Sequence, residues 1–183
     1  MTLSTERILR LADWIAADGM AEPAIGLLAF EHAIQTAELA TRAGADDELL
    51  VAALLHDVGH AEGGHEHGQW AQIHLAEWFS DRTLWLIEHH ITAKRYVCTV
   101  EPEYHARLSV DSQQSLRLQG GTLPAEEATV FSQHIWFDDA MRLRRWDDSA
   151  KRGGWLPRRF ESYSELIESE MERVAREQVT PRS

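Results

Sequence analysis

The chain has 183 residues, of which 44% are apolar, and this is enough for one domain with a packed core. Its formal net charge of −12 disfavours a nucleic-acid partner, because binding a phosphate backbone needs a concentrated basic surface. The single cysteine, Cys98, excludes an internal disulfide, and no apolar run approaches the ~20 residues needed to cross a bilayer. The N-terminus has no basic stretch followed by an apolar segment. We therefore expect a cytoplasmic protein without a membrane partner.

Apolar residues recur at helical spacing along nearly the whole chain. Asp46 can cap one helix and Pro124 can open another. In chain order, we predict helices over residues 5–17, 26–42, 48–57, 67–79, 81–91, 109–118, 125–132, 135–150 and 160–178, a loop over 59–64 and a short segment over 94–100. No stretch alternates with period two for long enough to predict a strand. The sequence therefore predicts an all-α helical bundle.

Histidine has an unusual distribution, since seven of the ten histidines lie between His56 and His90. An expression tag would be contiguous and terminal, and these histidines are neither. The clustering therefore favours a metal site built on neighbouring helices.

The strongest local pattern is HDVGH at residues 56–60, directly after an apolar run. A histidine and an aspartate at a helix end can turn toward one point, and imidazole nitrogen with carboxylate oxygen suits iron, manganese or zinc. The two oxygens of Asp57 could bridge two metal ions. Gly59 permits a sharp turn, so that His60 can face the same cavity.

Three distant residues of ligand type accompany this pair: His32, His90 and Asp147. Each lies near an apolar helix face, where a polar group without a partner is costly. One buried histidine is more often a satisfied core residue than a ligand. Together with His56 and Asp57, however, these residues favour a shared metal site.

These motifs resemble the HD-domain superfamily, and within it the mixed-valent di-iron oxygenases that cleave the carbon–phosphorus bond of organophosphonates; myo-inositol oxygenase is more distantly similar. The most specific phrases are AKRY at residues 93–96 and LQGG at residues 118–121. The likeness covers about residues 24–160. It implies a single HD domain over residues 1–183, which ends in a charged helix at about 160–178.

The resemblance implies an Fe(II)/Fe(III) pair and dioxygen as co-substrate. One iron would be bound by His32, His56, Asp57 and Asp147, with Asp57 bridging. The second iron would be bound by His90 and by another histidine about two dozen residues earlier. His67 fits this spacing best, His65 is the second choice and His74 the third.

A small anionic substrate is also implied. Lys94 lies one helical turn beyond His90 and would bind the anionic group, which His60 would also contact. Arg144, three residues before Asp147, could donate two hydrogen bonds to a phosphonate or carboxylate. A polar helix beside the substrate would contribute Ser112, Ser115 and Gln119.

These cations also have plainer interpretations. Lys94 could belong to a solvated helix end, and Arg144 could pair with a neighbouring aspartate such as Asp148. Asp148 itself is interpreted as an ordinary surface carboxylate. The Glu-rich last helix is typical of a solvated face or of a contact in a homo-oligomer.

One element of the phosphonate-cleaving relatives is missing. They carry a Tyr-x-x-Glu motif before the first histidine, whereas residues 23–28 here read PAIGLL. In those relatives the motif caps an iron and contacts the substrate, so its absence here leaves the identity of the substrate undetermined.

Three functions follow from these patterns. The first is a di-iron oxygenase that cleaves a small hydroxylated organophosphonate into phosphate and a carboxylic acid. The second is an HD-type phosphohydrolase, in which a metal-bound water attacks a nucleotide or phosphoester without dioxygen. The third is an HD domain without catalysis that acts as a binding module. The AKRY and LQGG phrases favour the oxygenase.

Overall fold

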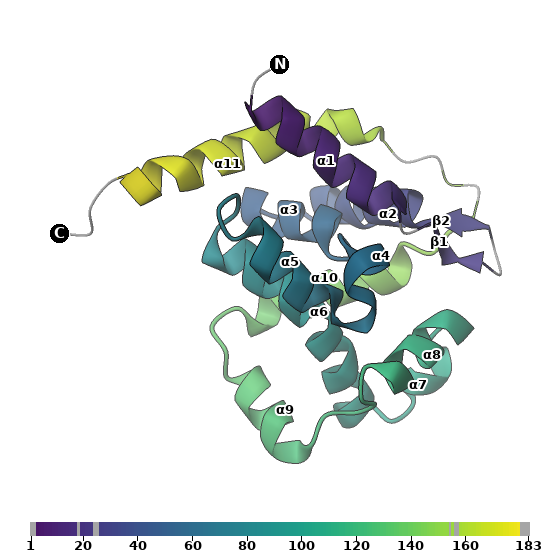
Figure 1. Ribbon diagram of the computed structural model, residues 1–183. Coiled ribbons are helices and arrows are strands. Elements are labelled where there is room, and N and C mark those ends of the chain that lie inside the picture. The colour runs from purple at the N-terminus through teal and green to yellow at the C-terminus, as the bar shows by residue number, and fades with distance from the viewer. Residues whose placement is uncertain (1–2, 18, 24–25, 154, 156–157, 180–183) are drawn as a thin grey trace.

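The computed structural model describes residues 3–17, 19–23, 26–153, 155 and 158–179. Figure 1 shows the arrangement of its helices. The α-helices are α1 (Leu3–Ala17), α2 (Ala29–Arg42), α3 (Asp47–Leu55), α4 (His60–Gly63), α5 (His67–Leu75), α6 (Asp81–Val100), α7 (Tyr104–Arg107), α8 (Val110–Leu118), α9 (Ala125–Ser132), α10 (Phe137–Ser149) and α11 (Ser164–Val179). Two 3-10 helices, η2 (Gly64–Glu66) and η3 (Phe160–Tyr163), complete the helical elements described. The predicted all-α class is thereby confirmed.

A short antiparallel hairpin departs from the prediction that no strand forms. It pairs β1 (Met20–Glu22) with β2 (Leu27–Leu28) directly before α2. Strands of two or three residues are too short to show an alternating pattern, so the sequence does not reveal them.

Helix α3 lies at the centre of the bundle. Its residues from Leu49 to Leu55 are all buried, which is expected of a helix that is apolar on every side. Helices α2, α6 and α10 pack around α3, and α5 packs along α6. Helices α1 and α11 lie side by side across one end of the molecule, and α7, α8 and α9 lie toward the opposite end (Figure 1). Among the described residues, no helix has the length and apolarity that a membrane span requires.

Helix α6 is longer than predicted. The expected helix at 81–91 and the segment at 94–100 form one continuous helix, which Ser80 caps by accepting a hydrogen bond from the amide of Thr83. The continuity places His90 and Lys94 one turn apart on the same face. Likewise, the predicted loop at 59–64 contains the short helix α4.

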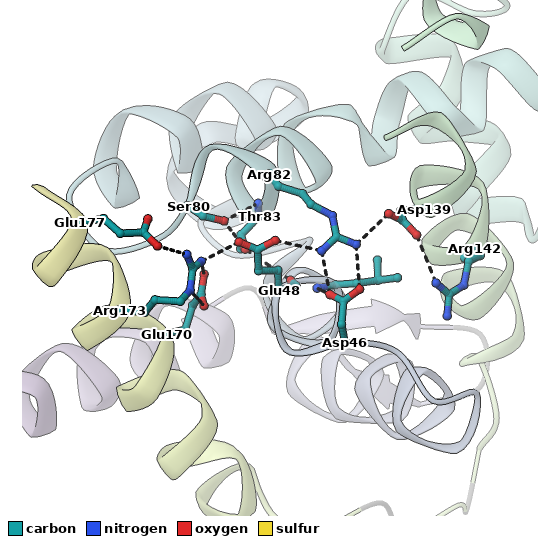
Figure 2. A network of polar contacts seen from close by, with 11 residues as sticks. Asp46, Glu48, Ser80, Arg82, Thr83, Asp139, Arg142, Glu170, Arg173 and Glu177 are labelled. Atoms are coloured by element: carbon teal, nitrogen blue, oxygen red, sulfur yellow. Dashed lines mark hydrogen bonds and ion pairs between the residues drawn. The ribbon is translucent and has the colours of Figure 1, made fainter. Parts of the chain in front are cut away.

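An ionic network joins α3, α6, α10 and α11 (Figure 2). The Arg82 guanidinium of α6 binds Asp46, Glu48 and Asp139, and so links α6 to the start of α3 and to α10. The Arg173 guanidinium of α11 binds the same Glu48. The network fixes the start of α6, the helix that carries His90.

Gly59 turns the chain sharply between α3 and α4 with a φ of 79°. A Cβ atom built there would lie 2.1 Å from Cε3 of Trp70, whose indole is held between Trp14 and the ring of His74. We expect Gly59→Ala to lower the free energy of unfolding by about 2–4 kcal/mol, from backbone strain and overpacking together. Chemical denaturation would measure the loss.

Gly44 provides the matched control, because its φ is 67° and a Cβ atom built on it would meet no heavy atom within 4 Å. Gly44→Ala should therefore cost only the backbone strain, about 1 kcal/mol. Equal losses in the two variants would show that the contact with Trp70 contributes nothing.

Candidate metal centre

Four buried imidazoles face one another in two pairs where α2, α3, α5 and α6 meet. His32 lies on α2, and its Nε2 is 3.3 Å from Nε2 of His56, the residue that ends α3. His67 begins α5, and its Nε2 is 3.2 Å from Nε2 of His90 on α6. The structure thus selects His67 as the partner of His90 from the three histidines that the spacing allowed.

The other ring nitrogens fix the protonation of three of these histidines. In His56, His67 and His90, Nδ1 lies 3.0, 2.7 and 2.6 Å from the carbonyl oxygen three residues earlier. A nitrogen facing a carbonyl must carry the proton, so in the neutral ring Nε2 presents its lone pair to the neighbouring histidine. Facing lone pairs repel each other unless a cation lies between them, and this arrangement fits a metal ion.

Asp57 lies between the two pairs. Its Oδ2 is 3.2 Å from Nε2 of His56 and 3.6 Å from Nε2 of His32. Its Oδ1 is 3.4 Å from Nε2 of both His67 and His90. The described residues therefore offer two groups of donors that share one carboxylate, each group within 4.8 Å.

Asp147 of α10 adds a second carboxylate to the first pair. Its Oδ1 lies 3.2 Å from Nε2 of His32, and its Oδ2 lies 3.9 Å from Nε2 of His56. The first donor group is His32, His56 and Asp57, and Asp147 lies beside it; these are the four residues predicted to bind one metal ion. Nitrogen and oxygen donors of this kind suit iron, manganese and zinc.

The electrostatics of the centre favour bound positive charge. Desolvation opposes ionisation of Asp57, but the charge of His56 together with hydrogen bonds from His56, His67 and His90 outweighs it and holds the pKa of Asp57 well below its usual range. Desolvation likewise opposes the charged form of His56, but the Asp57 carboxylate together with Asp147 and the Ala53 carbonyl outweighs it and raises the pKa of His56 to about 9. Burial lowers the pKa of His90 to about 4, so this ring is neutral and ready to ligate.

A close approach of two helices explains how His67 reaches His90. A Cβ atom built on Gly68 of α5 would lie 2.7 Å from the carbonyl oxygen of Glu88 on α6. Only glycine leaves room for the backbones at this distance. This close approach of α5 to α6 brings His67 to His90.

A further layer of charges orients Asp147. Nη1 of Arg144 lies 2.7 Å from Oδ2 of Asp147, and Nη2 donates to Asp148, which also accepts a hydrogen bond from the hydroxyl of Tyr104. Arg144 thus pairs with neighbouring aspartates, which was the alternative to a role in binding substrate. Asp148 is half-buried in this network, so its interpretation as a surface carboxylate is wrong.

The two donor groups open into a cavity of about 310 Å³. Its lining includes all five residues predicted to contact substrate from α4, α6 and α8, namely His60, Lys94, Ser112, Ser115 and Gln119. Arg144 also lines the cavity, although its guanidinium is bound to two aspartates.

Lys94 is buried and its Nζ donates a 2.9 Å hydrogen bond to Oγ of Ser115. Burial, with a smaller contribution from Arg144, lowers the pKa of Lys94 to about 8. His60 is exposed at the mouth of the cavity, with its ring 4.9 Å from that of His67. His65 lines the cavity outside both donor groups, and the exposed His74 binds the carbonyl of Trp70.

The hairpin forms another wall of the cavity, with Met20, Ala21 and Pro23. The missing Tyr-x-x-Glu motif would fall in this stretch, where Ala24 and Ile25 lie outside the described residues. Sequence reasoning missed Lys151, which also lines the cavity but follows the end of α10, where helical spacing predicts no direction for its side chain.

The helical bundle and its histidine–aspartate cluster define an all-α protein with a candidate metal centre. The HD domain family model matches residues 29–126, more than half of the chain, and the chain belongs to this family. The chain is 35% identical over 179 residues to hydroxymethylphosphonate dioxygenase of Gimesia maris, covering 91% of this chain and 89% of the relative.

A second relative comes from Leisingera caerulea, the 1-hydroxy-2-(trimethylamino)ethyl-phosphonate dioxygenase (glycine-betaine-forming). It is 34% identical over 134 residues, which cover 67% of this chain and 68% of the relative. The two relatives confirm the expected resemblance to HD-domain oxygenases.

Proposed function

We propose that the protein is a di-iron oxygenase that uses dioxygen to cleave the carbon–phosphorus bond of a small hydroxylated organophosphonate, with release of phosphate and a carboxylic acid. The observation that carries the proposal is the pair of donor groups sharing Asp57 beneath a cavity that contains a buried lysine. The dioxygenase names of two relatives support the reaction type.

In this proposal His32, His56, Asp57 and Asp147 hold one iron, and Asp57, His67 and His90 hold the other. When bound, the iron pair would supply Lewis acidity and the redox chemistry of dioxygen. The protein keeps the Nε2 lone pairs directed inward through the Nδ1 hydrogen bonds to backbone carbonyls.

The remaining cavity residues bind and orient the substrate. The ammonium of Lys94 neutralises the phosphonate, and the polar face of α8 offers Ser112, Ser115 and Gln119 to its oxygens. Because this anionic group is held against α6 and α8, the hydroxyl-bearing carbon is turned toward the donor groups. His60 lines the cavity beside His67 and contacts the substrate from there, and Arg144 acts by holding Asp147 in place.

The proposal is tested with iron-loaded protein and hydroxymethylphosphonate, by recording oxygen uptake and phosphate release together. His32→Ala should lose iron and lower turnover at least about 100-fold, because a ligand of the centre is removed. His74→Ala is the matched control, since this exposed histidine belongs to neither donor group.

A panel of phosphoesters and nucleotides, assayed without oxygen, distinguishes the oxygenase from the competing phosphohydrolase. Phosphate release from that panel in the absence of oxygen, with no oxygen uptake on phosphonates, would replace the oxygenase by a phosphohydrolase. Full iron content and normal turnover in His32→Ala would contradict the role of His32 as a ligand.

A further inference from the structure

Lys151 lines the cavity although it follows the end of α10. Its Nζ donates a 2.5 Å hydrogen bond to Oγ of Ser112 on α8. The ammonium therefore reaches the same wall of the cavity as the substrate-binding face of α8. It arrives from a different element than Lys94, which projects from α6.

Two serines of α8 arrange the two lysines side by side. Ser112 and Ser115 are three residues apart and so occupy one helix face. Ser112 accepts from Lys151 and Ser115 accepts from Lys94, while the hydroxyl of Ser115 donates to the backbone oxygen of Ser112. One turn of α8 thus holds two ammonium groups at neighbouring points of the cavity.

Two ammonium groups at neighbouring points repel each other, and Lys151 is among the charges that oppose protonation of Lys94. An anion bound between the two groups would relieve the repulsion, and a doubly charged anion would match both. Arg144 also lines the cavity, with its two terminal nitrogens bound to Asp147 and Asp148.

We propose that Lys151 is a substrate-binding residue that, together with Lys94, makes the cavity selective for a doubly charged tetrahedral anion over a singly charged one. The inference rests on the proposed function in that it assigns the head group of the phosphonate to this wall. It reassigns the second cation from Arg144, which the sequence suggested, to Lys151.

Sulfate and methyl sulfate are suitable probes, because both are tetrahedral and carry two and one negative charges, respectively, throughout the neutral pH range. Their dissociation constants are measured by calorimetry on the iron-loaded protein. Lys151→Met should weaken sulfate binding about 10- to 100-fold, as expected for a lost charge-assisted contact, and change methyl sulfate binding far less. Lys151→Arg should retain the preference for sulfate.

Arg152→Met is the matched control, because it removes the same charge from the adjacent exposed residue, whose backbone alone binds Gln35. It should leave both dissociation constants unchanged, and equal iron content in all variants would show that the centre is intact. Unchanged sulfate binding in Lys151→Met, or equal losses for the two probes, would overturn the proposal.

The same data separate this proposal from the oxygenase. Sulfate selectivity that depends on Lys151 in a protein without oxygen uptake on any phosphonate would support the anion site and contradict the proposed reaction. Oxygen-dependent phosphate release that is unaffected by Lys151→Met would support the reaction and contradict the role of Lys151.

Discussion

Replacing Asp57 with asparagine should remove iron from both halves of the centre at once. The carboxylate lies within 3.2–3.6 Å of Nε2 in all four histidines, His32, His56, His67 and His90. Asparagine keeps the shape of the side chain but removes the negative charge and presents an amide nitrogen as a donor to one of the two pairs. Neither group of donors would then be complete.

We expect Asp57→Asn to bind less than about one tenth of the iron of the wild-type protein and to lower turnover at least about 1000-fold, since both metal sites and the charge that attracts them are lost. Iron analysis and oxygen uptake measure the two effects. Circular dichroism establishes that the helices persist.

His90→Ala is the informative comparison, because His90 belongs to one donor group only. It should lose about half of the iron and retain the ion held by His32, His56, Asp57 and Asp147. If Asp57→Asn kept one iron while His90→Ala lost both, the shared position of Asp57 would be refuted.

Features that depend on local pattern could be predicted from the sequence. The helices follow from apolar spacing, and the candidate ligands His56 and Asp57 follow from an adjacent pair at a helix end. His32 and Asp147 could be proposed because each is a ligand type on an otherwise apolar helix face. The all-α class, which rests on such local periodicity, is confirmed.

Features that depend on packing between helices could not be predicted in this way. The choice of His67 rather than His65 depends on the close approach of α5 to α6 at Gly68. Spacing alone allows both histidines, since they differ by only two residues. The sequence also cannot show a hairpin of two- and three-residue strands beside the cavity.

The cations illustrate a related limit. A guanidinium three and four residues from two aspartates can pair with either of them or with a ligand, and only the structure shows that Arg144 binds both aspartates. Lys151 follows the helix and precedes glycines, where helical periodicity predicts no direction for a side chain. Its place in the cavity is set by the long-range hydrogen bond to Ser112.

The affinity of the cavity for an anion should fall at alkaline pH, because Lys94 loses its charge there. Burial lowers the pKa of this lysine to about 8, so its ammonium is present below that pH and is lost as the pH rises through it. Sulfate keeps its two charges over this range, so a change in its affinity reports the protein alone. We expect its dissociation constant to be flat below pH 8 and to rise by up to about tenfold per unit above it.

Lys94→Met should bind sulfate about 100-fold more weakly at pH 7 and lose the alkaline decline, since the titrating group is gone. Lys94→Arg should keep part of the affinity and move the decline beyond pH 10, because a guanidinium stays charged there. The exposed Arg145 offers a control, and Arg145→Met should reproduce the wild-type profile. A profile with the same decline in Lys94→Met would assign the titration to another group of the cavity and contradict this role for Lys94.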